Sequence, residues 1–171
     1  MKKALGTTVA IMVAAILIGT FITAKSSTAG EKAKDGCFIA YDNGTVLDTK
    51  TKLMWAAKDN GNAINWTDAK SYCENYHGGG YTDWRMPTQD ELAGLYDEAK
   101  TYKIDNGKIV HLTKLIHLTS FVVWASEIDV FTSAPSRSTT AATFFFSSGK
   151  RFRARATSFS EICALPVRST K

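Results

Sequence analysis

Two stretches of the chain carry apolar residues at the three-to-four-residue spacing of an amphipathic helix. Asn65 is placed to cap the first helix. The apolar face of this helix is formed by Trp66, Ala69, Tyr72, Cys73 and Tyr76. The second stretch follows Pro87 and opens with Thr88 and Glu91, the pattern of a capping box. Its apolar stripe is formed by Leu92, Leu95, Tyr96 and Ala99.

Short apolar segments separated by turn residues lie on both sides of the two expected helices. Such segments are typical of short β-strands. They occupy residues 37–41, 46–47, 53–55, 122–125, 143–147, 151–156 and 162–167. The order of strands, then two helices, then strands predicts an α+β domain rather than an alternating βαβ array.

The N-terminus has the pattern of an export signal. Lys2 and Lys3 precede residues 4–24, none of which is charged, and Ala29 offers a small-residue cleavage site. The uncharged run is also long enough to span a bilayer as a helix. We therefore expect a signal peptide or N-terminal membrane anchor at 1–29, a short linker at 30–36 and one domain at 37–171. The domain would be exported (periplasmic, cell-surface or secreted), with membrane contact only through the N-terminal segment.

Composition and charge narrow the class of protein. The chain has 171 residues, of which 44% are hydrophobic and 22% are charged, as in a folded globular domain. The net charge of +5 is uneven, because residues 31–131 are net acidic and residues 132–171 are strongly basic. The sequence has no phosphate-binding loop, nucleophile elbow or metal-ligand spacing. We therefore expect a non-enzymatic protein with no metal and no cofactor.

The chain has three cysteines, Cys37, Cys73 and Cys163. Export would bring them into an oxidising compartment, where cysteines pair. We favour a Cys73–Cys163 disulfide, which would close a loop of about 90 residues and stabilise the fold by about 4–5 kcal/mol in the chain-entropy description. The third thiol would then stay free or pair with another chain.

Arginines alternate with other residues near the C-terminus, at Arg151, Arg153 and Arg155. In a strand their side chains would share one face, roughly 7 Å apart, where like charges repel. One hypothesis is an anion-recognising face, because guanidinium groups suit sulfate, phosphate and carboxylate. The other is a solvated edge strand that charge protects from aggregation. The full candidate set adds neighbouring positions to these arginines: Lys150, Arg137, Ser126, Glu127, Asp129 and Phe131.

Several sequence segments resemble the Lcl C-terminal domain family. They are "DNGTVLDTKTKLMWA", "INWTDAKSYC", "GGYTDWRMPTQDEL", "WASE" and "ALPVR", and the resemblance runs from about Phe38 to Arg168. It implies a C-type lectin-like fold, in which two helices pack on a small twisted antiparallel sheet. It also implies a disulfide between the first helix and the last strand, at Cys73 and Cys163. The calcium and sugar motifs of calcium-dependent lectins are missing.

The same resemblance bears on residues 126–161. Five residue types, Ser, Thr, Ala, Phe and Arg, dominate this segment, and no Asn occurs after Asn106. Some C-type lectin-like proteins are diversified by retroelements that rewrite adenine-containing codons, which would leave such a composition. The chain is therefore also a candidate for a variable protein of a diversity-generating retroelement.

These observations together favour an exported, non-catalytic, adhesin-like ligand-binding domain. The expected ligand is an anionic glycan or a protein surface, and export argues against nucleic acid. The alternatives are a structural protein of the envelope and a fold-related periplasmic enzyme.

Overall fold

The computed structural model describes residues 29–131 and 138–170 of the chain. Within these residues it contains two short α-helices, one 3₁₀ turn and eleven strands in three sheets. The expected fold of two helices packed on one small antiparallel sheet is therefore wrong, because most of the regular secondary structure in the described residues is β-structure, divided among three sheets. The helices are α1, Trp66–Glu74, and α2, Gln89–Leu95, and the 3₁₀ turn is η1, Gly78–Gly80.

A five-stranded sheet has the order β1-β2-β3-β4-β11. All its neighbouring strands are antiparallel. Its strands are β1 Glu31–Asp35, β2 Phe38–Tyr41, β3 Thr45–Asp48, β4 Leu53–Ala56 and β11 Val167–Ser169. The segment 30–36, expected as a linker, thus contains a strand. The side chains of β1 are mostly exposed and polar. This segment therefore has no alternation of apolar and polar residues that would predict a strand from the sequence.

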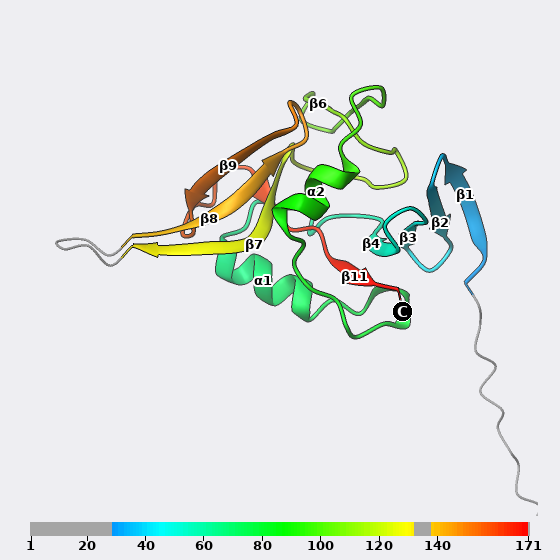
Figure 1. The fold of residues 1–171 in the computed structure, drawn as a ribbon, viewed down its shortest axis with the longest axis horizontal. Coiled ribbons are helices and arrows are strands. Elements are labelled where there is room, and N and C mark those ends of the chain that lie inside the picture. Colours follow the sequence, from blue (N-terminus) through cyan, green and yellow to red (C-terminus); the bar gives the residue numbers. More distant parts are fainter. Residues whose placement is uncertain (1–28, 132–137, 171) are drawn as a thin grey trace, which may run out of the picture.

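A four-stranded sheet has the order β10-β7-β8-β9. Its strands are β7 Val122–Phe131, β8 Ser138–Phe145, β9 Lys150–Arg155 and β10 Ile162–Cys163. Because β10 pairs with β7 in parallel, this sheet is mixed rather than purely antiparallel. A third, two-stranded sheet pairs β5 Tyr102–Lys103 with β6 Ile109–Val110. Figure 1 shows the four-stranded sheet and the β1–β2 hairpin on opposite sides of the molecule.

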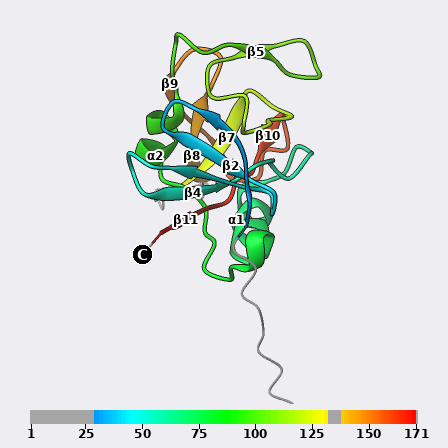
Figure 2. The ribbon, with the colours of Figure 1, turned by 90° about the vertical axis from the view of Figure 1, so that its right-hand side faces the viewer.

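The four-stranded sheet separates two hydrophobic clusters. On one side Val123 and Phe144 pack with Leu92 of α2 and with the five-stranded sheet. On the other side Trp124 and Ala141 pack with α1. Figures 1 and 2 show this layering, with α1 below the sheet and the β2–β4 strands in front of it in the second view. Strand β7 is thus buried on both faces along its first four residues.

Both helix starts follow the predicted capping chemistry. Asn65 accepts a hydrogen bond from the backbone N–H of Asp68 at 2.9 Å. Thr88 and Glu91 form a complete capping box. Helix α2 is shorter than its apolar stripe predicted, because the backbone turns extended at Tyr96.

The expected disulfide between Cys73 and Cys163 is not present. All three cysteines fall within the described residues and all are free thiols. Cys73 belongs to the cluster beside α1, whereas Cys163 belongs to the cluster on the other side of the four-stranded sheet. The Cys163 thiol donates a hydrogen bond to the carbonyl oxygen of Val122 at 3.4 Å. Hydrophobic packing, rather than a covalent link, holds these two segments in place.

Candidate functional site

The arginine-bearing strand β9 lies at an edge of the four-stranded sheet. A tight turn leads into it from β8, and Gly149 in this turn has a φ of 67°. A Cβ atom at Gly149 would stand 2.9 Å from the ring of Tyr96, so both the conformation and the space require glycine. The turn fixes the register that pairs Arg151 with Phe144 and Arg155 with Thr140.

Register and alternation divide the side chains of β8 and β9 between two faces. We call the first the arginine face. It carries Arg151, Arg153, Arg155, Thr140, Ala142 and Phe144, together with Asp129 of β7. We call the second the aromatic face. It carries Lys150, Phe152, Ala154, Ala141, Thr143 and Phe145, together with Trp124, Ile128 and Val130 of β7.

Two of the three arginines are paired with carboxylates of this chain. The Arg151 guanidinium lies 2.5 Å from Asp90 of α2, and the Arg153 guanidinium lies 2.7 Å from Asp129 of β7. Arg155 has no acidic partner within the described residues. The predicted shared face is therefore present, but much of its positive charge is balanced by residues that the sequence did not place beside it.

The remaining predicted site residues take different positions. Lys150 lies on the aromatic face, away from the arginines. Ser126 and Glu127 lie in an irregular part of β7, where the register shifts between Trp124 and Ile128. The backbone of Phe131 pairs with Ser138 at the end of β7, and Arg137 lies outside the described residues.

Glu127 holds the start of α2 on the sheet. Its carboxylate oxygens accept hydrogen bonds from the backbone N–H of Gln89 at 2.9 and 3.1 Å. The Gln89 amide in turn donates to the carbonyl oxygens of Thr143, at 2.8 Å, and Phe152, at 3.3 Å. A negative charge is favourable at a helix N-terminus. Glu127 thus has a structural role. Gln89, which no motif in the sequence marks, ties α2 to strands β8 and β9.

Arg85 and Glu91 form a bidentate ion pair beside this junction. Their oxygen–nitrogen distances are 2.7 and 2.6 Å. Burial alone would raise the pKa of Glu91, but hydrogen bonds from Arg85 and from Thr88 outweigh it and hold the pKa below its ordinary value. The pair fixes the segment before α2, so it is part of the scaffold.

The aromatic face carries apolar side chains that reach solvent. Phe152 is 47% exposed, Val130 is 51% exposed and Ile128 is 38% exposed. A cleft of about 340 Å³, which we call the aromatic cleft, opens beside Phe152. The arginines of β9 stand out in the sequence, whereas the residues between them do not. The same alternation contained the signal for Phe152, since residues that interleave with a charged row must face the other way.

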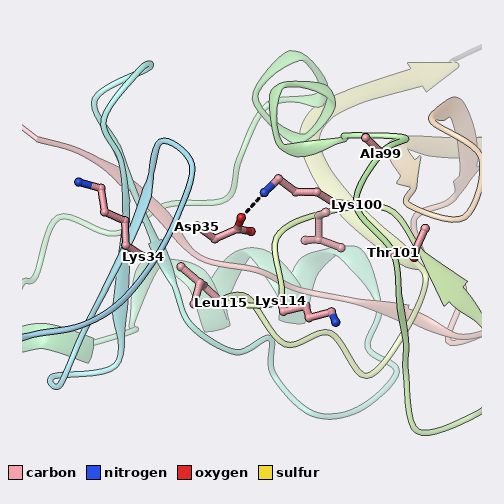
Figure 3. Close-up of a pocket in the computed structure, with 8 residues that line it drawn as sticks. Lys34, Asp35, Ala99, Lys100, Thr101, Lys114 and Leu115 are labelled. Atoms are coloured by element: carbon pink, nitrogen blue, oxygen red, sulfur yellow. Dashed lines mark hydrogen bonds and ion pairs between the residues drawn. The ribbon is translucent and has the colours of Figure 1, made fainter.

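A second cavity, of about 480 Å³, lies between the end of β1 and the segments around residues 100 and 114. Lys100 forms an ion pair with Asp35 there. Hydrogen bonds from Lys100 and Thr113 lower the pKa of Asp35. Figure 3 shows the ammonium groups of Lys34 and Lys114 pointing away from this pair. Because the charged groups do not converge, this cavity is a weaker candidate for a binding site than the four-stranded sheet.

Within residues 29–131 and 138–170, no group of three or more His, Cys, Asp or Glu side chains is arranged to hold a metal ion. In the same part of the chain, no helix is long and apolar enough to cross a membrane.

The architecture is that of a small β-rich domain with an exposed sheet edge. Residues 44–168 match the Lcl C-terminal domain family. This match covers most of the chain, so the protein belongs to the Lcl C-terminal domain family. A comparison with curated proteins found no match.

Proposed function

We propose that this protein is an exported, non-catalytic, adhesin-like ligand-binding domain whose arginine face holds an anionic glycan or an acidic protein surface. One observation carries the proposal. Arg151, Arg153 and Arg155 project from one face of an edge strand, and all three are exposed. Within the described residues, Arg155 has no acidic partner. An edge strand leaves this row open to a large ligand.

The two internal ion pairs do not prevent such binding. The side chains of Arg151 and Asp90 are 49% and 82% exposed, and those of Arg153 and Asp129 are 43% and 46% exposed. Exposed pairs of this kind contribute only about 0–1 kcal/mol. A polymer with several sulfate or carboxylate groups can displace the two carboxylates and use the forked geometry of guanidinium.

The proposal is tested with dextran sulfate and the triple variant Arg151→Ala/Arg153→Ala/Arg155→Ala. We expect at least tenfold weaker binding, measured by isothermal titration calorimetry, and a flatter dependence on salt. The matched control is Lys32→Ala/Lys34→Ala/Lys50→Ala, which removes three exposed positive charges from the first part of the chain. If both triple variants lose affinity equally, binding follows net charge alone and the proposed arginine site is wrong.

Export is proposed on the N-terminal sequence. Lys2, Lys3 and the uncharged residues 4–24 lie outside the described residues, and their pattern is that of a signal peptide or membrane anchor. Cell fractionation combined with intact-mass measurement tests this. We expect the protein in the periplasm, on the cell surface or in the medium; recovery of the full-length chain in the cytoplasm would contradict export.

We also propose that a retroelement diversifies residues 126–161. Burial limits the positions in this segment that can vary. Ala141, Ala142 and Phe144 are at most 1% exposed, so substitutions there would disrupt the packing of the sheet. Sequences of sibling genes test this. We expect variation at exposed positions such as 153 and 155, whereas variation spread equally over buried positions would contradict a role in ligand contact.

A further inference from the structure

The aromatic cleft is a second candidate binding site, and most of the residues of β8 and β9 that line it belong to the aromatic face. Its volume of about 340 Å³ is in the range of small-molecule sites. The lining residues come from β7, β8, β9 and the segment that follows β9. They are Phe121, Val122, Thr143, Phe145, Phe152, Arg153, Ala154, Ser158, Ser160, Glu161 and Ile162.

Three phenylalanine rings form a continuous row in this cleft. The ring centroids of Phe145 and Phe152 are 4.6 Å apart, and those of Phe121 and Phe145 are 5.8 Å apart. Phe152 is half exposed despite its size. A row of ring faces and edges offers stacking to an apolar group and attraction to a cation.

An unpartnered buried hydroxyl lines the cleft. Thr143 is 1% exposed, and its Oγ1 atom has no hydrogen-bond partner among the described residues. Thr143 lies between Trp124 and Phe152 in the register of the sheet, on the aromatic face. Burying a hydroxyl without a partner costs about 1–3 kcal/mol. Such a group is expected where a ligand supplies the missing hydrogen bond.

The segment after β9 adds further oxygen atoms. Ser158, Ser160 and Glu161 line the cleft, and Glu161 is exposed with no ion pair in the described part of the chain. Its backbone has a φ of 50°, an unfavourable conformation for this residue type. The hydroxyl of Ser120 donates a hydrogen bond to the Glu161 carbonyl oxygen and holds this conformation. The strained turn thus keeps a carboxylate-bearing residue at the cleft.

The cleft is therefore rich in hydrogen-bond acceptors. Among the described residues that line the cleft, Arg153 is the one with a positive charge. Its guanidinium is paired with Asp129, and both residues belong to the arginine face. The other polar groups are hydroxyls and one carboxylate. An anionic ligand would be repelled by Glu161, whereas an ammonium group has three donors for these oxygens.

We propose that the aromatic cleft binds a small organic amine, in which an apolar ring stacks on Phe145 and Phe152 and the ammonium group contacts Glu161 and the neighbouring hydroxyls. Of the three arginines of β9, Arg151 and Arg155 do not line this site, and the proposal does not depend on the function proposed for the arginine face. One ring of this row already has a cation beside it, since the ammonium of Lys108 lies 5.7 Å from the centroid of the Phe121 ring.

The test uses three probes of similar size: 2-phenylethylammonium, 2-phenylethanol and phenylacetate. Binding is followed by NMR chemical-shift titration of the full chain. We expect the ammonium probe to bind at least threefold more tightly than the alcohol, and the carboxylate to bind most weakly. Equal affinity of all three, or preference for phenylacetate, would overturn the proposal.

Variants separate the roles of charge, ring and hydroxyl. Glu161→Gln should weaken the ammonium probe three- to tenfold and leave the alcohol unchanged. Glu161→Asn should do the same while suiting the left-handed backbone, which guards against loss of folding. Phe152→Ala should weaken every probe, and Arg155→Ala on the other face should change none. If both Glu161 variants retain the preference for ammonium, the carboxylate is not the recognition group and the proposal fails.

Thr143→Val gives a readout that a purely structural role would not produce. Valine has the same shape and lacks the hydroxyl, so the unliganded protein should unfold at an equal or higher urea concentration. At the same time the affinity for 2-phenylethylammonium should fall at least twofold. A variant that is destabilised, or that binds the probe as tightly as the parent, would show that the hydroxyl does not serve the ligand.

Discussion

The two faces of the four-stranded sheet differ in whether their side chains already have partners within the chain. On the arginine face, two of three guanidinium groups already have partners in Asp90 and Asp129. On the aromatic face, Phe152 remains open and the Thr143 hydroxyl has no partner among the described residues. Charge is conspicuous in a sequence, but the described part of this sheet has its unpartnered buried hydroxyl on the aromatic face. A binding surface is better identified by side chains that have no partner within the chain than by its number of charged residues.

The largest expected effect is on the reactivity of the two buried thiols, Cys73 and Cys163, which lie on opposite sides of this sheet. Burial raises the pKa of Cys73 from 9.0 to about 12 and holds the pKa of Cys163 well above 9.0. At pH 8 a rise of this size lowers the thiolate fraction of Cys73 about a thousandfold. We expect a maleimide reagent to label only the partly buried Cys37 in the folded protein, and all three cysteines in urea.

Intact-mass analysis of the labelled protein supplies the measurement. Three labels in urea without reductant would agree with free thiols. A single label in urea, rising to three only after reduction, would show that Cys73 and Cys163 are bonded and would contradict the free thiols described here.

A matched pair of phenylalanines separates the buried part of the sheet from its exposed part. Phe144 is 1% exposed on the side of α2, whereas Phe152 is 47% exposed on the aromatic face. We expect Phe144→Ala to lower the free energy of unfolding by about 3–5 kcal/mol, since it leaves a cavity in the core. Phe152→Ala should lower it by no more than about 1 kcal/mol. Urea unfolding of both variants measures the difference, and equal losses would mean that Phe152 is a core residue rather than part of a binding surface.

Much of the local structure followed from the sequence, because its causes are local. Asn65 and the Thr88–Glu91 box marked both helix starts, and the alternation of arginines placed them on one face. The fold class was wrong, because the polar strand β1 and the parallel pairing of β10 with β7 are set by tertiary contacts.

The partners of the candidate site were equally hidden. Asp90 is on a helix and Asp129 is on another strand, so no spacing along the chain links either one to β9. The role of Glu127 at the start of α2 depends on an irregularity in β7 that has no local signature. The sequence showed which residues share each face. It did not show which of the arginines are already paired with carboxylates of the chain.

The scaffold below the arginine face gives a smaller effect that depends on pH. Because the folded protein lowers the pKa of Glu91 below its ordinary value of 4.5, the ionised carboxylate stabilises the fold above that pH and loses this contribution as the pH falls. Glu91→Gln should therefore lower the free energy of unfolding by about 1 kcal/mol at pH 7, through the weakened cap and ion pair. Urea unfolding between pH 7 and pH 3 should show the gap between parent and variant closing on acidification. A gap that is constant with pH would mean that charge plays no part.

The smallest expected effect separates the arginine face from its own counter-charges. Asp90→Asn/Asp129→Asn removes the carboxylates that compete for Arg151 and Arg153. Each exposed pair contributes about 0.2–1 kcal/mol, so the double variant should bind dextran sulfate about two- to tenfold more tightly at low salt. Because Arg153 also lines the aromatic cleft and loses its counter-charge, affinity for 2-phenylethylammonium should not rise. Asp97→Asn/Asp105→Asn, which makes the same change in net charge at carboxylates that do not pair with the arginines of β9, is the control. A gain in affinity confined to the Asp90→Asn/Asp129→Asn variant would mean that these two carboxylates compete with the ligand for the arginines. An equal gain in the control would mean that binding follows net charge and not the arginine face.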